Sequence, residues 1–116
     1  MKVVNYLDVE HQKNAPGVGE IPAGVVLRKV IGNEDNASFT MRVVEHKPAK
    51  NPPHGIHSHP WDHQCFVVSG QGVVIGEGGE VPLKAGDVVF IPGNEPHTFG
   101  PRGKEPFLFV DCISTL

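Results

Sequence analysis

The chain contains little of what disulfide-stapled, membrane-spanning or nucleic-acid-binding proteins require. It has two cysteines in 116 residues, and its 10 lysines and arginines stand against 13 aspartates and glutamates. Two cysteines do not make a disulfide framework, and without a basic block we expect neither a nucleic-acid nor a membrane partner. The apolar runs are short, as in 88–91, and the N-terminal residues include no secretory signal, so we expect a cytoplasmic protein.

Glycine and proline, in contrast, are abundant, with 14 and 11 residues. Both residue types disfavour long helices and favour tight turns. Short apolar runs recur, each closed by a turn signal, at 25–31, 39–44, 64–68, 73–75, 81–83, 87–91 and 107–113. Short strands separated by such turns are typical of an all-β sandwich or barrel. We therefore predict one all-β domain over residues 1–116.

Residues 8–20 are the least patterned part of the chain. We expect them to form an extended arm or a covering loop. Sheets made of short strands leave edges that invite association with another chain. We therefore expect a homodimer, in which the arm at 1–20 could add a strand across a two-fold axis.

Histidines are concentrated in one segment, since four of the seven fall between residues 54 and 63. His57, His59 and His63 share parity, so on a strand they would point to the same face. Three unliganded imidazoles buried together would cost desolvation and mutual repulsion, and a bound metal removes both costs. Imidazole is also the commonest protein ligand for transition metals. The spacing therefore predicts a metal site.

A fourth candidate ligand is His97, which follows the turn at 92–94 and begins the next predicted strand. This hairpin would bring His97 to the side opposite the first three histidines. The remaining histidines are interpreted differently. His54 has the other parity and is expected to be a surface or hydrogen-bonded residue, and His11 and His46 are expected to be solvated.

The two histidine segments resemble the two motifs of the cupin superfamily. The first motif matches at His57, His59, His63 and Gly70, and the second at Gly86, Pro92 and His97. His63 stands where a glutamate ligand is usual. The resemblance covers nearly the whole chain and is to small single-domain cupins with an all-histidine metal site. It implies a cupin-type β-barrel (a double-stranded β-helix, or jelly roll) with one divalent transition metal per chain.

The identity of the metal is open at this point. The resemblance implies Mn²⁺ or Fe²⁺. Four neutral nitrogen donors instead favour Fe²⁺, Ni²⁺, Cu²⁺ or Zn²⁺ over Mn²⁺. Because His63 replaces a carboxylate, the charge of the ion stays unneutralised by protein, and the centre should attract anionic or bidentate oxygen ligands.

Other residues could complete a pocket beside the metal. Asp111 is a carboxylate within an apolar run and is either an inward general base or a solvent-facing residue near the chain end. Cys65 is expected to be a small inward hydrophobe, or otherwise an oxidation-sensitive thiol. Phe109 would form an aromatic wall if it points inward, and Trp61 and Phe99 are pocket or rim aromatics unless they serve only packing.

Three function classes are compatible with such a site. The prediction is a metal-dependent oxidoreductase, dioxygenase-like or peroxide-using, that acts on a small oxygenated molecule. The alternatives are a lyase or isomerase for a hydroxy or keto acid, and a non-catalytic domain that binds or senses a small molecule. A purely structural site fits poorly, because structural zinc sites usually contain cysteine.

Arg28 and Arg42 lie mid-strand and either face solvent or bind a substrate carboxylate.

Overall fold

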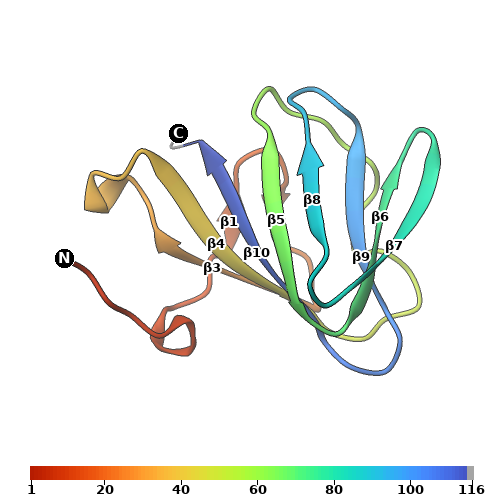
Figure 1. Ribbon diagram of the computed structural model, residues 1–116, viewed down its shortest axis with the longest axis horizontal. Coiled ribbons are helices and arrows are strands. Elements are labelled where there is room, and N and C mark those ends of the chain that lie inside the picture. Colours follow the sequence, from red (N-terminus) through yellow and green to blue (C-terminus); the bar gives the residue numbers. More distant parts are fainter. Residues whose placement is uncertain (115–116) are drawn as a thin grey trace.

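The structure is a computed structural model that describes residues 1–114, and it is built almost entirely from antiparallel strands (Figure 1). The strands are β1 (Asn14–Ala15), β2 (Gly19–Glu20), β3 (Val25–Ile31), β4 (Phe39–His46), β5 (His63–Ser69), β6 (Gln71–Gly76), β7 (Gly79–Lys84), β8 (Val88–Ile91), β9 (His97–Arg102) and β10 (Phe107–Ser114). Two 3₁₀ turns, η1 (Tyr6–Asp8) and η2 (Asn33–Asp35), are the helical elements of this range. The all-β prediction is confirmed.

The strands form two main sheets. One has the order β3-β4-β10-β5-β8, and the other has the order β7-β6-β9. The chain passes from one sheet to the other between β5 and β6, between β7 and β8, between β8 and β9, and again between β9 and β10. This winding places the two sheets around a shared interior, as in a jelly roll (Figure 1).

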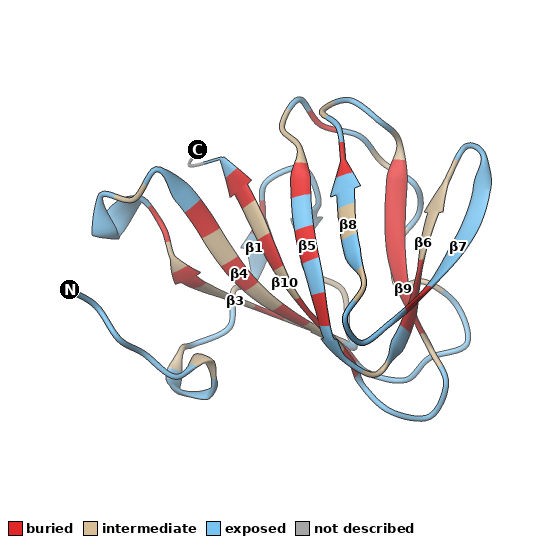
Figure 2. Ribbon diagram, viewed as in Figure 1, coloured by how far each residue is buried: buried red, intermediate tan, exposed pale blue. Residues whose placement is uncertain are grey.

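Side chains alternate between the interior and the outside along the larger sheet (Figure 2). On the central strand β10, Asp111 pairs with Arg42 of β4 on one side and with Cys65 of β5 on the other. The residues of such pairs share a face, so the register of three strands brings these side chains together inside the barrel. All three are buried.

Apolar packing closes the barrel below this polar group. Phe107 and Val67 are fully buried or nearly so, at 0% and 1% exposure. A Cβ on Gly72 would overlap the Phe107 ring, so this glycine is required by the close approach of β6 to the ring. Burying a phenylalanine of this kind contributes roughly 1.5–3 kcal/mol to folding.

Within the segment 8–20, the residues Ala15, Pro16 and Val18 line a cavity of the barrel. Strands β1 and β2 make a small hairpin whose Ala15 is buried. Gly17 lies in its turn with a φ of +78°, a conformation that favours glycine. A Cβ at Gly17 would stand 2.9 Å from Cδ2 of His59. The hairpin therefore packs directly against the histidine segment.

No helix between residues 1 and 114 has the length and apolar character needed to cross a membrane.

Candidate metal centre

The histidines reach the interior from three different pieces of chain. His63 begins β5 and His97 begins β9. His57 is joined to His97 by a two-residue bridge in which each backbone N–H donates to the other residue's carbonyl, at 3.0 and 2.9 Å. The expectation that one strand carries His57, His59 and His63 is wrong, because the segment bends at Pro60 before β5 begins.

The four imidazoles nevertheless converge. Ring centroids are 4.7 Å apart for His59 and His63, 4.8 Å for His57 and His97, and 4.9 Å for His63 and His97. One ligand nitrogen each of His57, His59 and His97 lies within 4.8 Å of the others. Nε2 of His59 lies 2.9 Å from Nε2 of His63. The structure thus brings the four predicted ligands together.

Each of the four rings has its Nδ1 atom against an acceptor oxygen. The acceptors are the carbonyl of Gly55 for His57 at 3.3 Å, the carbonyl of Trp61 for His59 at 2.8 Å, the carbonyl of Glu95 for His97 at 2.8 Å, and Oδ1 of Asp111 for His63 at 2.9 Å. A carbonyl or carboxylate oxygen can only accept, so each neutral ring carries its proton on Nδ1. The Nε2 lone pairs are then free, as metal ligation requires.

Burial keeps two of these rings in the ligand-ready, neutral form. It lowers the pKa of His97 to about 4 and the pKa of His59 below the ordinary value. Neighbouring histidines add to the effect at both rings, while the carbonyl beside each Nδ1 opposes it. Neither ring must lose a proton before it binds a metal at neutral pH.

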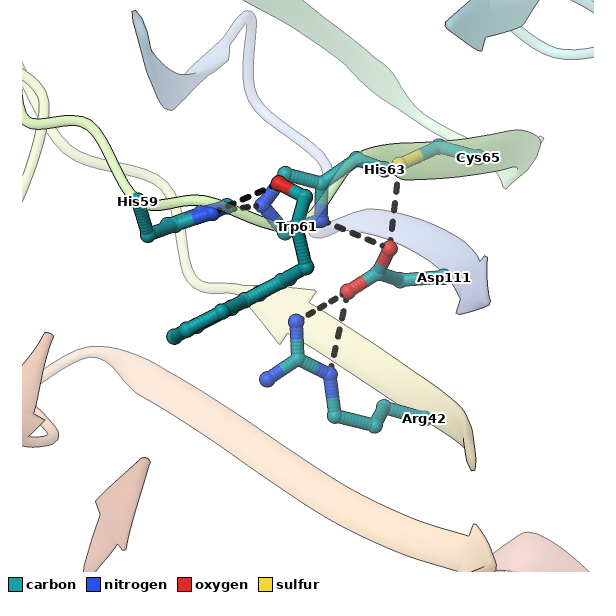
Figure 3. A network of polar contacts seen from close by, with 6 residues as sticks. All are labelled: Arg42, His59, Trp61, His63, Cys65 and Asp111. Atoms are coloured by element: carbon teal, nitrogen blue, oxygen red, sulfur yellow. Dashed lines mark hydrogen bonds and ion pairs between the residues drawn. The ribbon is translucent and has the colours of Figure 1, made fainter. Parts of the chain in front are cut away.

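Behind His63 lies a charged network that is closed to solvent (Figure 3). Arg42 donates from Nε to Oδ2 of Asp111 at 3.0 Å and also from Nη2. Oδ1 of Asp111 accepts from Nδ1 of His63 and from the Cys65 thiol, at 2.9 and 3.5 Å. Burial alone would raise the pKa of Asp111, but the His63 hydrogen bond and the Arg42 charge outweigh it and hold the pKa below its ordinary value. Asp111 is thus an ionised, inward carboxylate with both oxygens engaged.

A cavity of about 70 Å³ opens in front of the four histidines. Its polar lining also includes Arg42 and Asp111. Most of its walls are apolar and come from both main sheets and the β1–β2 hairpin, with Ala15, Pro16, Leu27, Val44, Phe99 and Phe109 among them. This space would hold a few water molecules or a small ligand.

Two of the four predicted pocket residues, Phe99 and Phe109, line this cavity, and their rings stack with centroids 5.0 Å apart. The Trp61 ring instead stacks on the His59 ring at 4.2 Å, nearly parallel, and supports it from behind. Cys65 is buried beside Asp111 behind the wall, and burial followed by the Asp111 charge raises the pKa of its thiol.

His46 was expected to be solvated, and this expectation is wrong. The residue is only 3% exposed and lines the cavity, with its ring 5.8 Å from that of Phe109. It has the same parity as Arg42 on β4, so the two side chains share the inward face of that strand. His11 is exposed, as expected, and His54 is half-buried beside the hydroxyl of Thr98.

The two mid-strand arginines, Arg28 and Arg42, point to different places. Arg42 takes the inward alternative, and its charge is matched by the Asp111 carboxylate. Arg28 donates to the Val9 carbonyl at 2.9 Å and lies over the Tyr6 ring, away from the cavity.

Two antiparallel sheets wound in this order around a buried cluster of imidazoles define a class of protein, the small jelly-roll barrels with a candidate metal centre. The model of the Cupin_2 family, the cupin domain, matches residues 42–113. The chain therefore belongs to the cupin domain family.

Among curated proteins, the oxalate-binding protein of Thermotoga maritima is 33% identical over 63 residues, which cover 53% of this chain and 52% of the relative. The chain thus spans about half the length of the curated relative it matches. The polyketide cyclase RemF from Streptomyces resistomycificus has a TM-score of 0.82 at 26% identity, covering 100% of this chain and 80% of that one. A structure described as a predicted oxalate decarboxylase from Thermotoga maritima has a TM-score of 0.76 at 26% identity, covering 99% and 100%.

Proposed function

We propose that the chain binds one divalent transition metal and acts as a metal-dependent oxidoreductase on a small oxygenated molecule. The ligands in this proposal are His57, His59, His63 and His97. The observation that carries it is the 2.9 Å separation between Nε2 of His59 and Nε2 of His63. Each ring has an acceptor oxygen at Nδ1, so with both rings neutral two lone pairs face each other there, and a cation between them would remove their repulsion.

The donor geometry also fits an ion. Two imidazole nitrogens bound at right angles, each about 2.0–2.1 Å from a metal, lie about 2.9 Å from each other. The four Nδ1 contacts, three to carbonyls and one to a carboxylate, are of the type that orients metal-ligating histidines. The residues present therefore fit a metal centre.

Imidazole donors suit iron, copper, nickel and zinc, and likeness to the family keeps Mn²⁺ and Fe²⁺ as the first candidates. A redox-active metal bound here would supply the chemistry of oxygen or peroxide activation. The chain itself orients His63 through Asp111 and neutralises that carboxylate with Arg42. Phe99 and Phe109 keep the cavity poorly hydrated, which strengthens electrostatic interactions inside it.

The role of Asp111 as a general base remains a prediction. Its two oxygens accept from Arg42, His63 and Cys65, and these contacts support a second role, that of a positioning residue for His63. The same observation favours the second candidate function, non-catalytic binding of a small chelating molecule. A lyase or isomerase for a hydroxy or keto acid would need a proton-transfer group in the cavity, and Asp111 would have to release one of these partners to serve.

One experiment separates the first two candidates. Protein loaded with Fe²⁺, Mn²⁺, Cu²⁺ or Zn²⁺ is assayed for oxygen uptake and peroxide turnover on a panel of small carboxylic acids, diketones and catechols. Turnover with a redox-active metal, and none with zinc or in His97→Ala, is the result expected of an oxidoreductase. The absence of metal-dependent turnover, together with saturable binding of one panel member, would favour the binding domain suggested by the name of the Thermotoga maritima relative.

We also propose that the chain forms a homodimer. Large apolar side chains project outward from β5 and the edge strand β8, where Phe66, Val88 and Phe90 are 50%, 73% and 59% exposed. Exposed apolar surface of this kind on a sheet edge supports association with a second copy. Sedimentation equilibrium at micromolar concentration should give the mass of a dimer, and the mass of a single chain would contradict the proposal.

A further inference from the structure

The end of β4 carries a buried polar atom that nothing in the described chain satisfies. His46 is 3% exposed, and its Nδ1 has no hydrogen-bond partner among residues 1–114. A buried donor or acceptor without a partner is costly, and native structures keep few of them without a function. The Nδ1 atoms of the four cluster histidines, in contrast, each lie against an acceptor.

His46 lines the same cavity as the histidine cluster and is held rigidly in its wall. Its ring packs against Phe107 and Phe109, with centroids at 6.0 and 5.8 Å. Phe109 stacks in turn on Phe99, which lies against the rings of the cluster at about 6 Å. Phe99 and Phe109 thus link His46 to the cluster along one wall of the cavity, and His54, whose ring lies 5.2 Å from that of His57, lines it as well.

The charges around His46 define what it can bind. Burial, followed by the nearby His54, lowers the pKa of His46 to about 4, so its imidazole is neutral at pH 7 with one donor and one acceptor nitrogen. The cavity's other charged side chains, Arg42 and Asp111, neutralise each other. An anionic group beside His46 would therefore be buried without a counter-charge, whereas a hydroxyl or carbonyl oxygen would be satisfied.

We propose that His46 is a specificity-determining residue that hydrogen-bonds an uncharged hydroxyl or carbonyl oxygen at the far end of the cavity ligand. The inference rests on the proposed function, because the other end of that ligand is the oxygen group that the histidine cluster and its metal attract. The ligand class is then a short molecule with a chelating, acidic head, an apolar body of a few carbons and a distal hydroxyl or keto group. A dicarboxylate that spans the cavity is disfavoured.

The test uses zinc-loaded protein and pairs of small chelators. Alkanohydroxamates of three to six carbons and their ω-hydroxy counterparts are titrated calorimetrically into the wild type, His46→Phe and His46→Asn. Phenylalanine keeps the ring packing and removes both nitrogens, whereas the asparagine amide can replace the hydrogen bond of Nδ1. In parallel, the imidazole ¹⁵N resonances of His46 are followed in the wild type, which makes the test independent of how the variants fold.

The wild type should prefer the ω-hydroxy member of at least one pair by about tenfold, the size expected of one buried hydrogen bond. His46→Phe should lose this preference while binding the unsubstituted member as the wild type does, and His46→Asn should regain part of it. The His46 nitrogen resonance should shift with the ω-hydroxy member alone. Equal affinities within every pair in the wild type, or an equal preference in the wild type and His46→Phe, would overturn the inference.

Failure of the proposed function gives a different result. If no zinc is retained, the metal proposal fails, and the inference about His46, which rests on it, is overturned with it. If zinc is retained but no hydroxamate binds at any length, the metal proposal stands and the inference about His46 is overturned.

Discussion

Asparagine at position 111 would keep the shape of the side chain and remove its negative charge from the centre of the buried network. Arg42 donates to one oxygen of Asp111, and Nδ1 of His63 donates to the other. Asparagine offers one acceptor oxygen, so its amide N–H group must face one of these two donors. Asp111→Asn therefore leaves the Arg42 charge buried without a counter-ion and at least one donor unsatisfied.

The expected effect on folding is large. Arg42 is 7% exposed and Asp111 is 1% exposed, so water screens their interaction poorly. Breaking a buried ion pair by removing one partner costs about 3–5 kcal/mol. With a slope of about 2 kcal/mol per molar urea, the unfolding midpoint of the metal-free protein should fall by about 2 M. Loss of the carboxylate that orients His63 should also weaken metal affinity by about 10- to 100-fold.

Urea unfolding followed by Trp61 fluorescence measures this effect in the wild type, Asp111→Asn, Arg42→Met and the double variant. Each single change leaves one buried charge unpaired, so the double variant should lose less free energy of unfolding than the sum of the single changes. Glu77→Gln, the same change of acid to amide at an exposed turn residue, is the matched control. Additive effects, or an Asp111→Asn protein within about 1 kcal/mol of the wild type, would refute the reasoning.

Three further predictions concern acid, the β1–β2 hairpin and the buried thiol. Metal-free protein should lose stability as the pH falls from about 6.5 to 4, because unfolded imidazoles take up protons near 6.5 whereas the folded pKa values of His46 and His97 are about 4. The loss in free energy of unfolding is on the order of 2 kcal/mol per histidine. Urea titrations at successive pH values should measure this loss, and His46→Phe should make it smaller. A free energy of unfolding that does not change between about pH 6.5 and 4 would contradict the prediction. Gly17→Ala should weaken metal binding, because its Cβ would press on His59. The control is Gly19→Ala, which lies at φ +79° with no atom within 4 Å of its Cβ and should cost only backbone strain of about 1–2 kcal/mol. Equal metal affinities of the two variants in calorimetry would refute this prediction. Cys65 should resist alkylation by iodoacetamide until the protein unfolds, because burial and the Asp111 charge raise the pKa of its thiol. Peptide mass spectrometry that finds Cys65 alkylated in the folded protein would contradict this prediction.

The order of short strands and turns, and the gathering of the four histidines, could be predicted from local signals. Glycine and proline turns separate the apolar runs that become β3 to β8 and β10. No apolar run marks β9, which was expected only as the strand that follows the turn at 92–94 and begins at His97, and this turn does deliver His97 to the cluster. The conformation of His57 and His59 was predicted incorrectly, because parity was assumed to run unbroken through Pro60. Their position is set instead by the bridge of His57 to His97, a contact 40 residues away along the chain.

The inward positions of Arg42 and His46 could not be decided from the sequence. Strand β4 carries apolar residues on both faces, such as Val43 and Val44, so hydrophobic alternation does not say which face is inside. The partner of Arg42 is Asp111, 69 residues later, and only the register of β4 on β10 brings the two together. The polar half of the cavity therefore depends on long-range strand pairing.

The number of metal ions bound per chain decides most directly whether the histidine cluster is a metal centre. Wild type, His63→Ala and His54→Ala are reconstituted with Fe²⁺ or Zn²⁺, dialysed and measured by elemental analysis. His54 is the matched control, since its ring lies 5.2 Å from that of His57 without belonging to the four proposed ligands. One ion per chain in the wild type and in His54→Ala, with most of it lost in His63→Ala, is the predicted result. A metal-free wild type, or equal losses in the two variants, would contradict it.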